Sequence, residues 1–125
     1  MTDWHVSKNF MHSEVACKCC GKVGRDQAET EKQILKMQEL RDHLGKPITV
    51  TSWHRCEKHN REVGGSAKSA HLWGGATDIV VAGIDPREVV AVGTLLGFTD
   101  VIRYARSKFV HVGTMVKHNP WVFNK

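Results

Sequence analysis

The architecture of this chain can be read outward from SAHLWGGATD, residues 69–78, and from FVHV, residues 109–112. These segments contain His71, Asp78 and His111, three side chains of the types that zinc accepts as ligands. Three protein ligands leave the fourth position of a tetrahedral zinc ion open for water, as in a catalytic site. Because zinc lowers the pKa of its bound water to about 7, the pattern indicates metal-assisted hydrolysis at neutral pH.

The chain must turn between the first two of these residues. His71 and Asp78 are too far apart in sequence to be neighbours on one helix face. Gly74 and Gly75 supply the turn, because glycine adopts left-handed dihedral angles without steric cost. The β-branched run at 79–82 then predicts a buried strand that Asp78 opens. Any single histidine or aspartate is more often a surface or hydrogen-bonding residue than a ligand, so the joint pattern carries the prediction.

Periodicity places the remaining elements. Apolar residues at helical spacing predict an amphipathic helix over 26–44, and a cap signal at 85–88 predicts a second helix that runs to residue 97. Strands are predicted over 48–53, 101–104 and 109–112. The last two can form a hairpin that sets His111 at a sheet edge facing the site. The predicted fold is α+β, with a small, mainly antiparallel sheet that carries the ligands on one face and helices packed behind it.

Composition limits the classes of protein that fit. With 125 residues, the chain is expected to form one domain over 1–125 and to act as a monomer. No apolar run approaches the ~20 residues of a membrane-spanning helix, and the N-terminus carries no export signal. The net charge is +5, but the basic residues are scattered and no nucleic-acid-binding motif is present. Membrane insertion and nucleic-acid binding are therefore not expected.

The motif at residues 69–78 also carries a family resemblance. Its order Ser-x-His-x-x-Gly-x-Ala-x-Asp, with the later Phe-Val-His-Val, resembles the zinc D-Ala-D-Ala carboxypeptidases and the related phage endolysins and murein endopeptidases. Their metal-binding fold also occurs in the hedgehog signalling domain. Further segments between residues 9 and 65 look like the family's usual path to the first ligand, so the resemblance covers most of the chain. It implies one catalytic zinc ion bound by His71, Asp78 and His111.

Substrate-binding residues are also implied by the resemblance. Arg55 follows the strand predicted over 48–53, at a place where the resembled enzymes use an arginine to contact substrate. Its forked, permanently charged group suits a terminal carboxylate or the oxyanion of amide hydrolysis. Asn60 and Ser69 are further candidate contacts. The alternative for Arg55 is an exposed salt bridge without a catalytic role.

The chain departs from the family at two places. The family's Ser-Gly-Tyr-Arg is Ser-Trp-His-Arg here, and we expect the indole of Trp53 to reshape the substrate groove. Near relatives have His-Val-Asp where this chain has Gly113, and residues 106–108 offer no carboxylate that could act as general base. His54 and His118 are the remaining candidates for that role, because a base must reach the metal-bound water directly or through one water molecule. Either could equally be an ordinary surface histidine.

The four cysteines allow three interpretations. Cys17, Cys19 and Cys20 could begin a structural zinc site with Cys56, but Cys-x-Cys-Cys is not the usual spacing of a zinc-binding pair. One disulfide between Cys56 and the cluster is also compatible with the sequence. Reduced thiols are the preferred interpretation for a chain folded in the cytosol.

These observations predict a zinc-dependent peptidoglycan peptidase that cleaves an amide of the peptide stem or cross-link. A phage or prophage origin fits best, with synthesis in the host cytoplasm and action on the wall after release or as part of a virion. The positive charge would suit the anionic wall polymer. Two alternatives remain open, namely a wall-binding protein that keeps zinc without turnover and a virion structural protein. The motifs do not distinguish which peptidoglycan bond would be cut.

Overall fold

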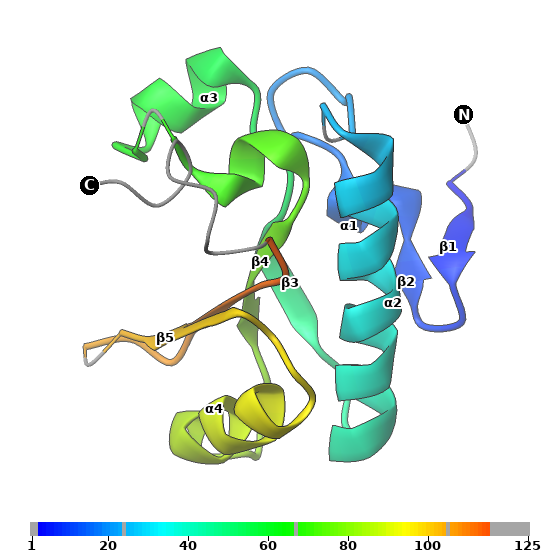
Figure 1. Ribbon diagram of the computed structural model, residues 1–125, viewed down its shortest axis with the longest axis vertical. Coiled ribbons are helices and arrows are strands. Elements are labelled where there is room, and N and C mark those ends of the chain that lie inside the picture. Colours follow the sequence, from blue (N-terminus) through cyan, green and yellow to red (C-terminus); the bar gives the residue numbers. More distant parts are fainter. Residues whose placement is uncertain (1–2, 24, 67, 105, 116–125) are drawn as a thin grey trace.

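The computed structural model describes residues 3–23, 25–66, 68–104 and 106–115 (Figure 1). In chain order the elements are β1 (His5–Ser7), β2 (Phe10–Met11), α1 (His12–Val15), α2 (Gln27–Leu44), β3 (Thr49–Ser52), α3 (Glu57–Glu62), the 3-10 helix η1 (Ala70–Trp73), β4 (Ala76–Val80), α4 (Pro86–Leu95), β5 (Asp100–Arg103) and β6 (Val110–Gly113). The described part of the chain contains no helix with the length and apolarity that a membrane crossing needs.

The central sheet has the strand order β3-β4-β6-β5, and each neighbouring pair is antiparallel. β1 and β2 form a separate antiparallel pair. The predicted α+β class with a small, mainly antiparallel sheet is therefore confirmed, and so is the hairpin of β5 and β6.

Two predictions about the strands are wrong in detail. β6 lies between β4 and β5, so His111 is on an inner strand and not at a sheet edge. The reason is that β6 pairs with β4 along its whole length, from Ala76↔Gly113 to Ile79↔Val110. The same pairing extends β4 back to Ala76, so Asp78 lies in the middle of its strand and not at the start. Both ligand-bearing strands are thus held on two sides.

The long helix α2 begins and ends as its sequence indicates. The side chain of Asp26 accepts the backbone N–H of Glu29 at 3.0 Å and caps the N-terminus. Gly45 ends the helix with φ 67°, and its N–H donates to the carbonyl of Arg41 at 3.1 Å. Glycine suits this left-handed position because it has no Cβ.

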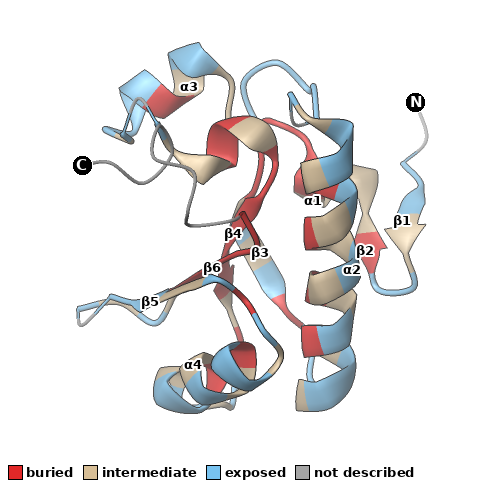
Figure 2. Ribbon diagram, viewed as in Figure 1, coloured by how far each residue is buried: buried red, intermediate tan, exposed pale blue. Residues whose placement is uncertain are grey.

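The sheet packs against helices on the face opposite the ligands. Figure 2 shows the buried residues concentrated on β4, β6 and the inner sides of α2 and α4. From α2, the buried Gln33 amide donates to Thr77 Oγ1 and to the carbonyl of Val112, both at 3.0 Å, and accepts from Thr114 Oγ1 at 2.9 Å. Since side chains alternate along a strand, Thr77 and Val112 point to α2 while their neighbours Asp78 and His111 point to the other face.

Candidate metal centre

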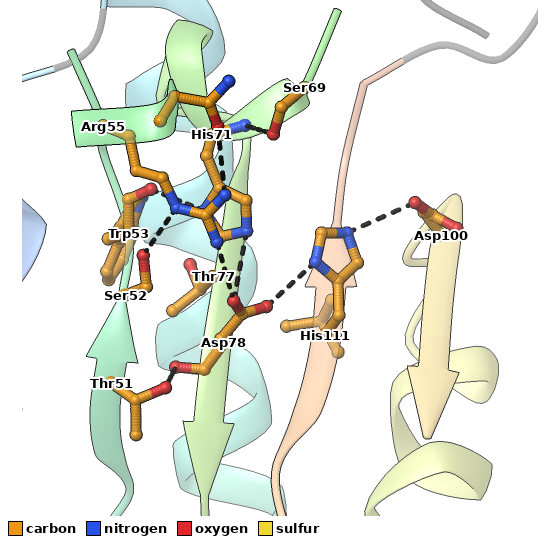
Figure 3. Close-up of polar contacts among 12 residues, drawn as sticks. Thr51, Ser52, Trp53, Arg55, Ser69, His71, Thr77, Asp78, Asp100 and His111 are labelled. Carbon is orange, nitrogen blue, oxygen red and sulfur yellow. Dashed lines mark hydrogen bonds and ion pairs between the residues drawn. The ribbon is translucent and has the colours of Figure 1, made fainter. Parts of the chain in front are cut away.

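His71, Asp78 and His111 converge on one point, although they come from three different elements (Figure 3). Asp78 and His111 are directly opposite one another in the β4–β6 register. The Asp78 carboxylate lies between the histidines, 2.9 Å from His111 Nδ1 and 3.4 Å from His71 Nε2. One donor atom from each residue lies within 4.8 Å of the others, and all three residues are buried.

The orientation of His71 is fixed by backbone contacts. Its Nδ1–H donates to the carbonyl of Trp53 at 2.6 Å, which leaves Nε2 to face Asp78. Ser69 caps η1 by accepting the His71 backbone N–H at 3.2 Å, and Gly74 ends this short helix with φ 82°. Burial lowers the pKa of His71 and favours its neutral form, the form that binds a metal.

His111 lies between two carboxylates. Its Nδ1 contacts Asp78, and its Nε2 lies 3.3 Å from Oδ2 of Asp100 on β5. Burial disfavours the charged ring, but the hydrogen bonds to Asp100 and Asp78 outweigh burial and raise the pKa of His111 to about 9. Asp78 responds in the opposite sense: although burial opposes its ionisation, the hydrogen bond from His111 and the proximity of the His71 ring hold its pKa well below its usual range. The carboxylate is thus ionised and available as a ligand.

Arg55 reaches the same carboxylate from the segment after β3. Its Nη2–H donates to Asp78 Oδ2 at 3.2 Å, while Nε–H and Nη1–H donate to Ser52 Oγ and Asn60 Oδ1, each at 3.1 Å. The Asn60 amide in turn donates to the carbonyl of Ser66 at 2.8 Å. Ser69 and Asn60, predicted as substrate contacts, are therefore placed where they support His71 and Arg55.

Close packing of the backbone holds the Arg55–Asn60 pair in place. A Cβ atom added to Gly65 would overlap Asn60 Oδ1 and would lie 2.8 Å from Arg55 Nη1. Gly65 has no unusual φ, so space alone requires glycine here. The N–H of Gly65 also donates to the Asn60 carbonyl at 2.8 Å, which closes the chain onto α3.

One candidate base, His54, and the indole of Trp53 are both held by backbone carbonyls. The ring of His54 is buried, and its Nδ1–H donates to the backbone carbonyl of His71 at 3.1 Å, behind the ligand. His118 lies outside the described residues. Trp53 is 1% exposed, and its Nε1–H donates to the carbonyl of Gly74 at 3.0 Å. Hydrogen bonding and contact with the core thus turn the indole inward, and its effect on the substrate groove stays a prediction.

Asp100 belongs to the site although no motif in the sequence marks it. Asp100 is directly opposite Gly113 in the β5–β6 register, so its carboxylate lies across the strand from the position where near relatives have aspartate. The predicted β5–β6 hairpin indicates that residues at the start of β5 lie beside the end of β6, near His111. The exact register between the two strands is needed to show that Asp100 is the residue that reaches His111. Burial and the negative charges of Asp78 and Asp100 also raise the pKa of Tyr104, which therefore lies near the site.

The types and orientations of the donor atoms in this centre suit a bound metal ion. Two imidazoles and one ionised carboxylate point at a common centre, and the second nitrogen of each imidazole is held by a protein oxygen. Outer partners of this kind fix the tautomer of metal-binding histidines. These residues therefore fit a divalent transition metal with one or more open positions.

A comparison with protein-family models identifies the class. Residues 8–113 match the model of the family described as peptidase M15. This match spans most of the chain, and the chain therefore belongs to the peptidase M15 family, which consists of metal-dependent peptidases. The predicted resemblance to zinc D-Ala-D-Ala carboxypeptidases is confirmed at the level of the family. No curated protein matches the chain significantly.

Proposed function

We propose that this chain is a zinc-dependent peptidase that cleaves an amide bond in the peptide stem or cross-link of peptidoglycan. The observation that carries the proposal is the convergence of His71, Asp78 and His111 beside a guanidinium that is held in place. The three ligands would hold a metal ion, and the Arg55 guanidinium would bind the negative charge of the substrate or of the oxyanion. Metal-assisted hydrolysis of a peptide bond uses both. Peptidase chemistry is what the family implies, whereas the metal and the substrate are our assignment.

Zinc is the metal that this donor set fits best, and when bound it supplies a Lewis acid and an activated water. His71 would offer Nε2 and His111 would offer Nδ1, the nitrogens that face Asp78. Asp100 would keep the remaining N–H of His111 as a hydrogen-bond donor and so hold the ring in the ligand tautomer. The protein thus orients each ligand before the metal arrives.

Arg55 is placed to bind the anionic part of the substrate. A guanidinium has five N–H donors, and the contacts with Ser52, Asn60 and Asp78 use one on each of its three nitrogens. One donor therefore remains on each terminal nitrogen. This forked pair can hold a substrate carboxylate or the oxyanion that forms during hydrolysis.

The decisive experiment tests metal and activity together. Purified, zinc-loaded protein is incubated with purified cell walls, and the released fragments are identified by mass spectrometry. We expect fragments that define one cleaved amide, and we expect His71→Ala to release none and to lose the zinc held by the His/Asp centre. His43→Ala, which changes an exposed histidine at the end of α2, is the matched control and keeps native activity.

The same experiment separates the proposed peptidase from both alternatives, because neither a wall-binding protein nor a virion structural protein would release fragments. A native protein that holds zinc in this centre, binds walls and releases no fragment would overturn the proposal in favour of a wall-binding protein. The net charge of +5 suits the anionic wall in either case. A role in phage lysis remains a prediction that rests on the resemblance to phage endolysins.

A further inference from the structure

A second cluster of metal-binding side chains lies apart from the His/Asp centre. The Sγ atoms of Cys17, Cys20 and Cys56 lie within 4.8 Å of one another, and none of these cysteines is in a disulfide. Cys56 is brought to the other two from the start of α3. Cys17 and Cys20 have the spacing Cys-x-x-Cys and are followed by Gly21, a pattern that is typical of a zinc-binding turn. The intervening Cys19 obscures this spacing in the sequence.

Backbone N–H groups point at two of these sulfurs, those of Cys17 and Cys56. Cys17 Sγ accepts the N–H of Cys19 at 3.4 Å and the N–H of Cys56 at 3.3 Å. Gly21 closes the turn with φ 75°, and its N–H donates to the Cys17 carbonyl at 2.8 Å. Cys56 Sγ accepts the N–H of His59 at 3.4 Å as the N-cap of α3. Donors aimed at sulfur stabilise thiolates, which are the form that binds metal.

A fourth sulfur is close by, and the surroundings are basic. The Cys19 thiol is near enough to Cys56 to hydrogen-bond with it, and the positive charge of Lys58 acts on the Cys19 sulfur. Lys18 lies within the turn and Lys22 directly follows it. Positive neighbours offset the net negative charge that four thiolates around one divalent ion would carry.

We propose that Cys17, Cys20 and Cys56 bind a structural zinc ion, with Cys19 as the fourth ligand. Four sulfur ligands complete the tetrahedron and leave no position for water, so this ion would be structural and not catalytic. Soft thiolates favour zinc over hard cations such as magnesium and calcium. The geometry of Cys17, Cys20 and Cys56 carries this site, which does not depend on the function proposed for the His/Asp centre.

The position of this cluster gives it a structural role near the active centre. It joins the segment that follows α1 to the first turn of α3, at the same end of the molecule (Figure 1). The neighbouring ion pair between Arg25 and Glu57, at 2.9 Å, makes a parallel connection. Because Cys56 directly follows Arg55, a metal bound here would fix the segment that positions the guanidinium.

Cobalt substitution tests this proposal without using activity. Co²⁺ reports its ligands directly, since sulfur ligands add intense charge-transfer absorption in the near ultraviolet and tetrahedral geometry adds strong visible bands. We expect the native chain, prepared under reducing conditions, to hold about two zinc ions and the cobalt form to show the thiolate bands. Cys20→Ser should lose these bands and about one zinc ion. Cys20 is exposed, so the serine variant leaves the core unchanged.

Two controls separate this site from the His/Asp centre. Lys18→Ser changes an exposed residue of the same turn and should keep the thiolate bands. His71→Ala should also keep them while losing the zinc of the other centre. The proposal is overturned if the reduced native chain shows no thiolate bands with cobalt, or if Cys20→Ser keeps them. Isolation of a stable disulfide among the cysteines in protein purified without added oxidant would likewise overturn it.

Discussion

The sheet side and the connecting side of the His/Asp centre are held in different ways (Figure 3). On the sheet side, Asp78, His111 and Asp100 lie on three adjacent strands, and the backbone ladder sets their spacing. On the connecting side, His71 and Arg55 lie on segments between the strands. Their positions depend on individual hydrogen bonds that they donate to a capping hydroxyl, a backbone carbonyl and a side-chain amide oxygen.

This difference predicts how each side responds to change. A strand in the middle of a sheet is held by many ladder hydrogen bonds, so the loss of one distant contact moves its side chains little. A side chain held by two or three single contacts loses its position when one contact is removed. We therefore expect substitutions on the connecting side to alter catalysis at nearly constant stability, and substitutions behind the sheet to alter stability at nearly constant catalysis.

Among substitutions that leave all three metal ligands in place, the largest effect on the connecting side is expected for Arg55→Ala. Removal of the donors that face the substrate should lower wall hydrolysis by about a hundredfold or more, the usual effect of losing one oxyanion contact. Zinc analysis should still show the metal of the His/Asp centre, since Arg55 contacts the ligand Asp78 without replacing it. Arg55→Lys should rescue poorly, because a point charge cannot reproduce three fixed contacts and a free forked pair. Hydrolysis within a few-fold of native in the alanine variant would remove Arg55 from the mechanism.

On the sheet side, Asp100→Asn should lower the metal affinity of the His/Asp centre. The amide cannot hold His111 as a carboxylate does, and loss of such an outer partner typically costs about 10–100-fold in metal affinity. Competition with a chelator measures this affinity without reference to activity. Asp42→Asn, an exposed change on α2, is the matched control. An unchanged affinity at the His/Asp centre would show that the 3.3 Å contact between Asp100 and His111 does not position the ligand.

The candidate ligands could be predicted from sequence because their signals are local or form a known motif. The helix over 27–44 follows from a capping aspartate, a helical period and a terminal glycine, all within one segment. Asp100 and the inner position of β6 depend instead on the register between strands that are distant in sequence. The role of Gly65 depends on which side chains pack against it, and no local pattern encodes that contact. The cysteine cluster was obscured by an extra cysteine inside a regular spacing.

A smaller effect on catalysis is expected for Gly65→Ala. The added methyl group would displace Asn60 Oδ1 and Arg55 Nη1, so the guanidinium would lose one of its three supports. Loss of one such hydrogen bond, worth about 1 kcal/mol, should slow hydrolysis several-fold. Gly93→Ala is the matched control, because its Cβ would meet neighbours at an ordinary 3.7 Å. Equal rates for both variants would show that the packing at Gly65 does not support Arg55.

The smallest effect is expected behind the sheet, at the N-terminus of α2. Asp26→Ala removes the acceptor of the Glu29 N–H, and loss of an N-cap typically costs about 1 kcal/mol in the free energy of unfolding. Denaturant unfolding measures this loss, and Asp26→Asn should restore most of it because asparagine also caps helices. Although α2 supports β4 and β6 through Gln33, the strand register keeps Asp78 and His111 opposite one another. Metal affinity and the rate of wall hydrolysis should therefore stay native in Asp26→Ala. A parallel fall in metal affinity and stability would mean that α2, and not the strand ladder, holds the ligands of the sheet side in place.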